Sequence, residues 1–411
     1  MNNTEACKTH EPYEAQNYST SVGKIHLSDF PPKMCFFLEG DVRYELFEAA
    51  INMVGSLNKL APLVRKDSGI LVRYRQGILS RDEIKSDLPI PQELLRKLCE
   101  IAGEDFNLND LERHVLWYKS SRGARRVYNP KLPIIEGPEL FRVISHLICD
   151  GNVSPTGSSE YCNSELTLHE QLKADIRATF GDIELQTSRM RGGWFRTIIS
   201  KTISNLLFHR YGIEFSTYEA RLPKPLFLAP KKYARAALEA LADDEGYIGG
   251  HQIQLGVSNE MLCRDYFALL QIHFPNILKH AVFCQYKNSG TQCGMFYIIR
   301  IRSTGFLSFN DEISFRHPKK RARLIAYLSR PKSPRKSSLP GVTRNKIIAL
   351  LKKGPHTRHE LAKKLDLHPD SITHHLNNKN SLEIQGLIGK GIVRRKGRGK
   401  YGRYIYELVK E

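Results

Sequence analysis

Two carboxylates, Asp150 and Glu245, stand in the same local setting although they are far apart in the sequence. Each ends an apolar run of helical periodicity and precedes a glycine, in the segments VISHLICDGNVS (143–154) and LEALADDEGYIGG (238–250). If the two helices pack side by side, the acids meet at one point, where the negative ends of both helix dipoles also favour cations. Two divalent cations about 4 Å apart at such a point can stabilise the attacking and leaving oxygens of phosphodiester hydrolysis.

Small residues at the contact would let the two helix backbones approach closely, and Ser145 and Ala240 occupy equivalent positions in this role. The next equivalent pair is less usual, because Cys149 stands opposite Asp244. A buried, unpaired charge at residue 244 would cost enough free energy to move the helices apart. We therefore expect Asp244 to weaken the contact, with inactivation of one half as the extreme result.

The sequence around the two segments repeats. Beyond each acid the same order of strand-like and helix-like runs follows, and Asn163 and Asn259 come 13 and 14 residues after the two acids. We predict an α+β domain over residues 136–330, built from two pseudo-symmetric αββαββα halves, 136–220 and 221–330.

This combination resembles the LAGLIDADG homing endonuclease family. The nine-residue motif of the family lies over Val143–Gly151 and Leu238–Gly246, and the resemblance extends to RLPK (221–224) and FNDEISFRHPKKRARL (309–324). It covers about half of the chain. The resemblance implies a saddle over double-stranded DNA and a monomeric enzyme that makes a site-specific double-strand break with short 3′ overhangs. It also implies a role in moving an intron or a free-standing gene.

The resemblance further implies the roles of individual residues. The residues that would hold the cofactor, Mg²⁺ or Mn²⁺, are Asp150, Glu245, Gly151 and Gly246. Lys319, and Lys224 as its counterpart after the first half, would stabilise charge near the cleaved phosphates. The alternative for these lysines is that they are ordinary surface charges.

Alternation along the predicted strands indicates a polar surface that could face DNA. In QIQLGV (252–257) the two glutamines point to one side and the aliphatic residues to the core, and in FYIIRIR (296–302) the two arginines share one face. Gln and Arg side chains read adenine and guanine edges bidentately. The residues of this domain that we expect to contact DNA are Gln186, Arg189, Arg196, Gln252, Gln254, Arg300, Arg302 and Lys320. Taken alone, any one strand could equally be the solvated face of an ordinary sheet.

The overall charge favours a polyanionic partner. The 411 residues include 62 Lys or Arg against 43 Asp or Glu, which gives a formal charge of +19 and a pI near 9.5. Nucleic acid is the commonest polyanion that a basic protein meets. The alternative is a ribosome-associated or merely basic protein.

The N-terminal third is predicted to contain a second DNA-binding module. Residues 1–34 lack apolar periodicity and are expected to form a polar tail. Residues 35–112 are predicted to form a helical, helix-turn-helix-like domain in which Arg73 and Arg75 contact DNA, and residues 113–135 a connector. A small helical bundle with a solvated arginine pair is the alternative.

The C-terminal region is predicted to be independent, because residues 331–341 have the Pro, Ser and basic composition of a linker. Residues 342–411 show a helix, helix, helix, hairpin pattern, with Thr357 and Glu360 as a capping box and 16 Lys or Arg against 6 Asp or Glu. This pattern predicts a winged-helix DNA-binding domain, and a winged helix that binds only protein is the alternative. The residues expected to contact DNA are Ser371, Thr373, His374, Arg394, Arg395, Lys396 and Arg398.

Cysteine usage and hydropathy indicate the compartment. The eight cysteines show no CxxC pair and no His partner at zinc-ligand spacing, so we expect free thiols, with a Cys284–Cys293 disulfide as the alternative. No apolar run is long enough to cross a bilayer, and the polar start does not have the layout of a signal peptide. We expect a soluble, cytoplasmic protein that associates with the nucleoid in a prokaryotic cell.

Two functions from different classes remain. The first is a metal-dependent DNA endonuclease whose flanking domains add affinity and register. The second is a non-catalytic transcriptional regulator that keeps the saddle only for binding. The carboxylates in both motifs favour the enzyme, and Asp244 favours the regulator.

Overall fold

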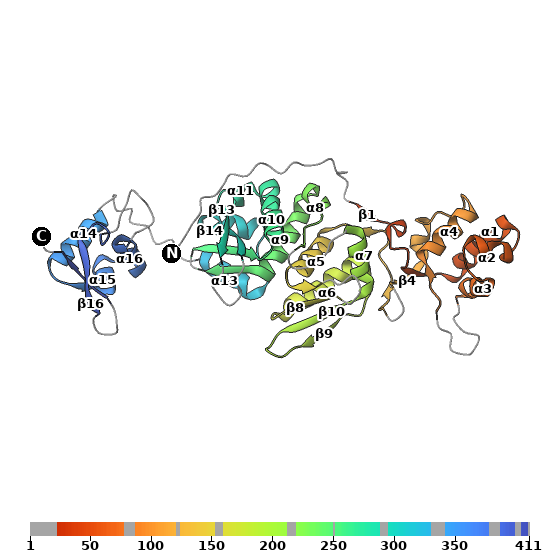
Figure 1. Cartoon of the computed structure of the whole chain (residues 1–411), viewed down its shortest axis with the longest axis horizontal. Coiled ribbons are helices and arrows are strands. Elements are labelled where there is room, and N and C mark those ends of the chain that lie inside the picture. The colour runs from red at the N-terminus through yellow and green to blue at the C-terminus, as the bar shows by residue number, and fades with distance from the viewer. Residues whose placement is uncertain are drawn as a thin grey trace. The chain divides into compact units, whose positions relative to one another are not determined.

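The computed structural model divides the chain into two compact units, Met1–Arg330 and Pro331–Glu411 (Figure 1). No helix among the described residues is both long enough and apolar enough to cross a membrane. The residues that the structure describes are 23–77, 87–120, 124–152, 159–211, 219–249, 251–287, 295–329, 342–377, 387–398 and 404–409.

The first unit begins with helices packed on a small sheet. The elements of this part are β1 (Lys24–Ile25), η1 (Leu27–Asp29), β2 (Cys35–Leu38), α1 (Gly40–Val54), α2 (Leu57–Leu63), α3 (Ser68–Gln76), β3 (Ile90–Pro91), α4 (Gln92–Ala102), η2 (Asp110–His114), β4 (Val115–Lys119), β5 (Val127–Tyr128) and β6 (Ile134–Ile135). Four of the strands form a sheet in the order β3-β2-β4-β5. Phe36 and Leu38 alternate along β2 and are fully buried, as are Leu46 of α1 and Leu95 of α4. Burial of these side chains holds the helices on the sheet.

Residues 23–34 correct the predicted polar tail, whose residues 1–22 lie outside the described residues. β1 pairs antiparallel with β6, and Ile25, Leu27 and Phe30 are buried in the core of the first unit. The prediction was wrong here because three separated apolar residues give no periodic signal.

The domain predicted to be helical over residues 35–112 also contains β-structure, and the predicted connector over residues 113–135 supplies β4 and β5 to its sheet. β2 pairs with β4, which lies far along the chain. Strands of two to five residues that pair with distant partners leave little alternation to detect. The helical periodicity of residues 35–112 was therefore detected, whereas these short strands were not.

The rest of the first unit contains two sets of helices and strands that follow each other in the chain. The first set consists of α5 (Pro138–Cys149), β7 (Gly151–Asn152), β8 (Ser159–Asn163), α6 (Leu166–Phe180), β9 (Gln186–Arg189), β10 (Phe195–Ile199) and α7 (Lys201–Tyr211). The second set consists of α8 (Pro225–Leu228), α9 (Lys231–Glu245), β11 (Gly246–Gly249), β12 (Gln252–Val257), α10 (Glu260–His273), α11 (Pro275–Leu278), β13 (Ala281–Lys287), β14 (Met295–Arg302), η3 (Ser303–Gly305), α12 (Phe306–Glu312) and α13 (Pro318–Leu328).

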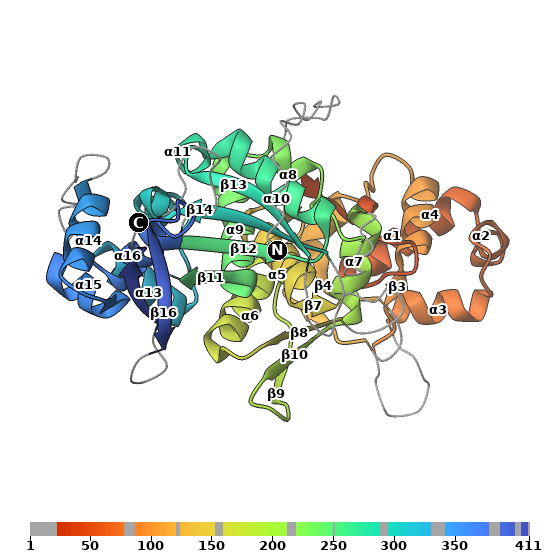
Figure 2. The same ribbon diagram turned by 60° about the vertical axis from the view of Figure 1, so that its left-hand side comes forward.

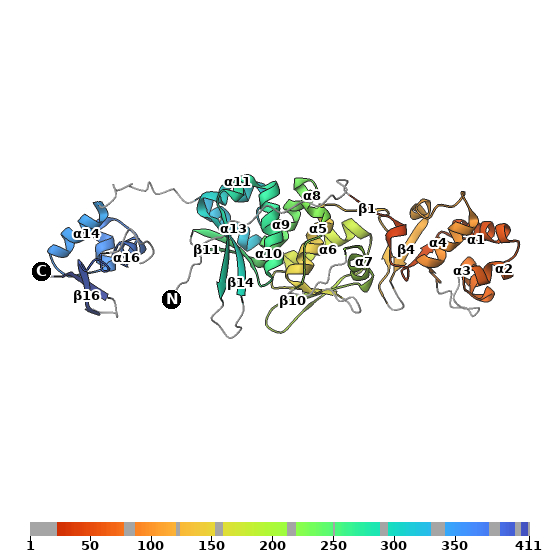
Figure 3. The ribbon, with the colours of Figure 1, turned by 45° about the horizontal axis from the view of Figure 1, so that its top comes forward.

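The two sets share one sheet topology. The first sheet has the order β7-β8-β10-β9 and the second β11-β12-β14-β13, so in both the fourth strand lies between the second and the third. All of these strand pairs are antiparallel. α5 and α9 lie side by side in the middle of the unit (Figures 1 and 3). This mixed α+β arrangement agrees with the predicted fold class.

The second unit has its own small core. Its elements are α14 (Val342–Lys352), β15 (His356–Thr357), α15 (Arg358–Leu365), α16 (Pro369–Asn377), β16 (Val393–Arg398) and β17 (Tyr404–Leu408), with the sheet order β15-β17-β16. Ile347, Leu361 and Ile372, one from each helix, are fully buried together. Thr357 caps α15 and forms the predicted capping box with Glu360. Three helices followed by a hairpin match the predicted winged-helix pattern.

The thiols of Cys35, Cys99, Cys149, Cys162 and Cys263 are not in disulfides, as expected. The alternative disulfide between Cys284 and Cys293 stays a prediction, because residue 293 lies outside the described residues, as does Cys7.

Candidate functional site

The packing of α5 against α9 brings Asp150 and Glu245 to one end of the helix pair. Ser145 of α5 and Ala240 of α9 are fully buried, so small side chains lie in the contact as predicted. Asp150 is the C-cap residue of α5, and Glu245 is the last residue of α9. Both acids therefore stand at the negative ends of helix dipoles, an arrangement that opposes anions and favours a cation.

The two carboxyl groups are hard to ionise in the absence of a cation. Burial, together with the charges of Asp150 and Asp244, raises the pKa of Glu245 to about 8. Burial and the charge of Asp244 raise the pKa of Asp150 to about 7, although a hydrogen bond from Asn163 acts in the opposite direction. Like charges at close range disfavour the ionised forms of Asp150 and Glu245.

The glycine after each acid is required by close backbone approach. A Cβ atom on Gly151 would lie 2.6 Å from the carbonyl oxygen of Leu147, one turn back in α5. A Cβ atom on Gly246 would lie closer still to the carbonyl oxygen of Ala242, and 2.9 Å from the ring of Phe315. Real Cβ atoms do not approach other atoms so closely, so any side chain at either position would push the strand away from the helix end.

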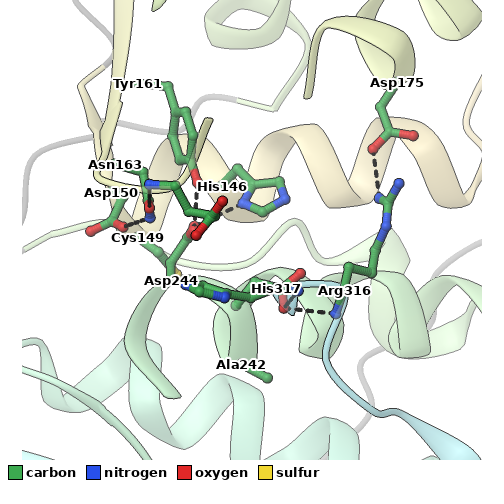
Figure 4. A network of polar contacts seen from close by, with 12 residues as sticks. His146, Cys149, Asp150, Tyr161, Asn163, Asp175, Ala242, Asp244, Arg316 and His317 are labelled. Atoms are coloured by element: carbon green, nitrogen blue, oxygen red, sulfur yellow. Dashed lines mark hydrogen bonds and ion pairs between the residues drawn. The ribbon is translucent and has the colours of Figure 1, made fainter. Parts of the chain in front are cut away.

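A buried ion-pairing contact crosses the helix interface. His146 Nδ1 of α5 lies 2.8 Å from Asp244 Oδ2 of α9, and neither side chain is exposed to solvent. The hydroxyl of Tyr161, on β8, donates to Asp244 Oδ1 at 2.7 Å. Figure 4 shows Asp244 between these two partners. The side chain at position 244 is therefore fully partnered, which corrects the expectation of an unpaired charge.

The His146–Asp244 pair is electrically neutral near pH 7. Burial raises the pKa of Asp244 to about 8. Burial also lowers the pKa of His146 to about 4, although nearby acids raise it. Both shifts favour the neutral forms, so the carboxyl donates from Oδ2 to Nδ1 and the pair carries no net charge. The carboxyl group that was expected to be unpaired is therefore compensated by His146 of the other helix.

Asp150 is held by an amide from the neighbouring strand. Asn163 Nδ2, at the end of β8, donates to Asp150 Oδ2 at 2.8 Å (Figure 4). Asn259, its repeat counterpart, instead donates to the carbonyl of Ala220 and caps α10 through Leu262 N. The two acids are thus supported differently in the two halves.

A chain of hydrogen bonds runs from the sheet to the support of Asp150. His169 Nε2 lies 3.1 Å from the carbonyl oxygen of Asn163, and His169 Nδ1 lies 2.8 Å from Thr197 Oγ1 of β10. Because a carbonyl only accepts, Nε2 carries the proton and Nδ1 accepts from the threonine. Thr197 Oγ1 also lies 2.8 Å from Thr187 Oγ1 of β9. Strands β9 and β10 are therefore linked to Asp150 through buried side chains.

Lys320 closes the C-terminal end of α9. Its Nζ donates to the carbonyl oxygens of Ala242, Asp243 and Asp244 in the last turn, the first of which also accepts the N–H of Gly246. Burial lowers its pKa, while the charges of the surrounding acids raise it. Asp243 Oδ1 accepts the backbone N–H groups of Arg316 and His317 at 2.8 Å each, which fixes the start of α13 against α9.

The two lysines of HPKKRAR occupy environments that differ from each other. Lys320, expected to contact DNA, is mostly buried beside the acids. Lys319, expected next to the cleaved phosphates, is 77% exposed and pairs with Glu165 at 3.0 Å. Lys224 is exposed at the N-cap of α8. Sequence adjacency could not tell which of the two lysines faces inward, because that depends on where α13 begins.

The donor set fits a hard divalent cation held by few protein ligands. In the described part of the chain, no cluster of three or more His, Cys, Asp or Glu side chains is arranged to hold a metal ion. Two carboxylates at one point are what Mg²⁺ commonly takes from a protein, with water and substrate phosphates completing its coordination. Gly151 and Gly246 offer only backbone groups next to the two acids.

The sheets carry most of the predicted DNA-contacting side chains. On the second sheet Gln252 stands opposite Arg302 and Gln254 opposite Arg300, while Ile253 between the glutamines is buried. A single polar face therefore carries both types of base-reading side chain.

On the first sheet Gln186 and Arg189 are exposed along β9, and Ser188 stands opposite Arg196 of β10. Arg196 lies 3.6 Å from Glu160 of β8, a half-exposed ion pair that water screens. The alternation of exposed and buried residues that was predicted from sequence is present in both sheets.

The two arginines of the first unit that were predicted to contact DNA lie in different environments. Arg73 of α3 is exposed. Arg75 donates to Glu48 Oε1 of α1 at 2.7 Å, and its guanidinium lies 5.5 Å from the centre of the Tyr44 ring. Arg75 thus holds α3 against α1. This structural role was not predicted from the sequence.

The second unit places its predicted residues on α16 and the hairpin. Ser371 and His374 are exposed on α16, and Thr373 donates to the carbonyl of Pro369. The basic side chains of the hairpin that are exposed are Arg394, Arg395 and Lys396. Arg398 ends β16, and its side chain lies outside the described residues.

Comparison with known proteins gives a family match in the second unit. Residues 341–388 match the model of the bacterial regulatory protein arsR family. The match supports a helix-turn-helix region of the winged-helix type and a DNA partner for it. The chain is also 24% identical over 233 residues to glutamine–fructose-6-phosphate aminotransferase of Methanocaldococcus jannaschii, a match that covers 54% of this chain and only 19% of that protein.

Among solved structures, mesophilic variants of the homing endonuclease I-DmoI are similar with a TM-score of 0.33 and 13% identity, over 46% of this chain and 97% of theirs. I-DmoI in complex with DNA and Mn has a TM-score of 0.31 and 12% identity, over 43% and 96%. Full-length DUF199/WhiA from Thermatoga maritima has a TM-score of 0.32 and 13% identity, over 58% and 88%. The LAGLIDADG resemblance of the chain stays a prediction.

The His146–Asp244 pair predicts a strong coupling between two distant residues. Asp244→Ala leaves His146 Nδ1 and the Tyr161 hydroxyl buried without a partner, so we expect it to destabilise the fold by about 2–4 kcal/mol. The double variant His146→Leu/Asp244→Ala should recover part of this loss, because it removes the imidazole, whose Nε2 already lacks a partner, and leaves only the Tyr161 hydroxyl unpaired. Urea unfolding of the two single variants and the double variant measures the coupling. Additive losses would contradict it.

The raised pKa values of Asp150 and Glu245 predict a metal-dependent pH profile of stability. Their folded-state pKa values exceed the unfolded values near 4, so the metal-free protein binds more protons when folded and loses stability as pH rises from about 4 to about 8. A cation binds the ionised acids, so Mg²⁺ should raise the melting temperature more at about pH 8.5 than at about pH 5.5. Thermal unfolding with Mg²⁺ or EDTA tests this. An equal Mg²⁺ effect in the variant Asp150→Asn/Glu245→Gln would refute it.

Proposed function

We propose that the chain is a site-specific, divalent-metal-dependent DNA endonuclease that hydrolyses phosphodiester bonds in both strands of duplex DNA. The observation that carries this proposal is the convergence of Asp150 and Glu245 at the ends of two packed helices, each with a raised pKa. Two acids that repel each other are retained at a cost in stability, and holding a cation is the chemical use that removes this cost.

Asp150 and Glu245 would hold Mg²⁺ or Mn²⁺. The bound ion would supply positive charge to the oxygens of the phosphodiester bond that is hydrolysed. Asn163 orients Asp150 through its hydrogen bond, and Lys320 fixes the end of α9 and offsets part of the charge of the acids. Both are positioning residues, because their polar groups are directed at protein atoms.

The exposed lysines would act on the DNA. Lys319 is mostly exposed and pairs only at a screened surface site with Glu165, so DNA phosphates can replace its partner. Together with Lys224 it would stabilise charge near the cleaved phosphates.

The two sheets would form a saddle whose polar faces lie on the major groove. The common strand order of the sheets supports a pseudo-twofold relation between the halves within a monomer, so that each half faces one half of the target. The pairs Gln252–Arg302 and Gln254–Arg300 place an amide beside a guanidinium twice on one face. Such side chains distinguish adenine and guanine by bidentate hydrogen bonds.

A non-catalytic regulator is the second candidate, and the arsR-family match over residues 341–388 favours it. In that case the acids would be remnants and the chain would only bind DNA. Incubating the protein with a plasmid that carries the flanks of its own gene, with Mg²⁺ or with EDTA, separates the two. Cleavage in Mg²⁺ alone supports the enzyme, whereas tight binding without cleavage in Mg²⁺ and Mn²⁺ supports the regulator.

Substitution of either acid should abolish cleavage but preserve binding. Asp150→Asn and Glu245→Gln keep side-chain size and remove a charge, so each should lower the cleavage rate by more than about a hundredfold, beyond the 10- to 100-fold expected for Asn163→Ala. Filter binding in Ca²⁺ should show unchanged or tighter DNA affinity, because repulsion of the phosphates falls. Asn259→Ala, at the repeat position that touches no acid, is the matched control. Cleavage that survives both acid variants would place the active site elsewhere.

Deletion of residues 343–411 should weaken DNA binding without removing catalysis. The deletion removes 16 Lys or Arg and 6 Asp or Glu but neither acid of the proposed site. Each lost phosphate contact should reduce the slope of log affinity against log salt by about 0.9. Affinity of the deletion variant and the full chain, measured over a salt series, tests this. Equal affinities at every salt concentration would show that the second unit does not bind DNA in the complex.

A further inference from the structure

The turn between β9 and β10 exposes large apolar side chains. We call Arg189–Trp194 the hairpin tip. Trp194 is 49% exposed and Met190 41% exposed, although side chains of this size are usually covered. The hairpin projects away from the helices in two views (Figures 1 and 2). The apolar surface is therefore available to a partner.

The hairpin tip has a defined conformation. Met190 N donates to the carbonyl of Trp194 at 2.7 Å, and Gly193 N donates to the carbonyl of Met190 at 3.4 Å. Gly192 and Gly193 have φ values of 88° and 86°, which other residues rarely adopt. The two glycines let the chain reverse within a few residues, so Trp194 is presented on an ordered turn.

The charges around the tip fit a polyanion. The stretch LQTSRMRGGWFRTIISK (185–201) contains three arginines and one lysine, and no Asp or Glu. Arg189 and Arg191 are both exposed on either side of Met190. An apolar patch for a protein partner or a lipid core would not require this one-sided charge, whereas backbone phosphates do.

The tip also continues the polar face proposed to contact DNA. Trp194 immediately precedes β10, in which the ring of Phe195 lies against His169 and Arg196 stands opposite Ser188. Continued alternation would direct Trp194 to the side of Arg196. Apolar side chains that reach DNA beside arginines enter between base steps, unstack them and bend the duplex. An aromatic ring at this position is suited to that contact because it stacks on any base.

We infer that the hairpin tip inserts Trp194 into duplex DNA at a base step, with Arg189 and Arg191 on the flanking phosphates. This inference rests on the proposed function, since it requires that the sheet faces DNA. It adds a site of DNA deformation away from the acids, through which sequence would be selected by flexibility as well as by hydrogen bonds.

The two tryptophans of the chain allow a direct test. Trp117 is 3% exposed and stacks on Phe37, so Trp117→Phe leaves Trp194 as the sole indole without disturbing the tip. Full-length Trp117→Phe protein is titrated in Ca²⁺ with a duplex selected by the protein from a randomised pool. Stacking should quench the Trp194 emission by more than about half, and 2-aminopurine placed at the contacted step should brighten as it unstacks.

Variants of the tip separate insertion from simple contact. Trp194→Ala should weaken binding by about tenfold and abolish the 2-aminopurine signal, whereas Trp194→Phe should keep most of both. Arg191→Gln should lower the salt slope but keep the unstacking signal. Exposed Met53, at 67% exposure on α1, gives the control Met53→Ala, for which no change is expected.

Tight binding with unchanged Trp194 emission and a silent 2-aminopurine probe would overturn the insertion while leaving the endonuclease proposal intact. Binding that survives Trp194→Ala unchanged would do the same. Failure of the full chain to retain any duplex in Ca²⁺ would overturn both. Quenching of Trp194 by anionic lipid vesicles but not by the duplex would assign the tip to a membrane surface instead.

Discussion

The closeness of α5 and α9 is the constraint on which the rest of the first unit depends, and the His146–Asp244 pair sets it. Two helices that carry acids at the same end repel each other where they should meet. The pair places a 2.8 Å contact between the helices and carries no net charge, because burial favours the neutral forms of both the imidazole and the carboxyl group. Tyr161 extends the same contact to β8 and so ties the helices to the first sheet. An apolar contact would pack equally well but would not fix the register of the helices by hydrogen bonds.

The outer supports of the two acids are unequal. On the side of Asp150, the hydrogen bonds of Asn163, His169 and Thr197 lead outward to β9 and β10. On the side of Glu245, Lys320 binds the end of α9. A displacement of the first sheet therefore acts on the carboxylate of Asp150, whereas a displacement of α13 acts on the backbone that carries Glu245. Two halves with the same strand order thus position their acids by different physical means.

Local patterns predicted what depends on local interactions. The two motif helices, the alternation in β12 and β14, and the capping box of α15 all follow from residues within a few positions of each other. The sheet over β2 and β4 and the burial of residues 23–34 could not be predicted, because their partners are distant in sequence. The same holds in the site, where Asp244 was expected to be unpaired because its partner, His146, is distant in sequence. The inward position of Lys320 likewise depends on the start of α13.

Four acids lie around the end of α9, and the protein relieves three of them by itself. Asp244 donates a hydrogen bond to His146, Asp243 accepts two backbone N–H groups, and Asp150 accepts an amide. In the part of the chain that the structure describes, the carboxylate of Glu245 receives no hydrogen bond. Its pKa is raised to about 8 by burial and by its acidic neighbours. If the proposed cation binds at this point, Glu245 is therefore the acid whose ionised form it would stabilise most.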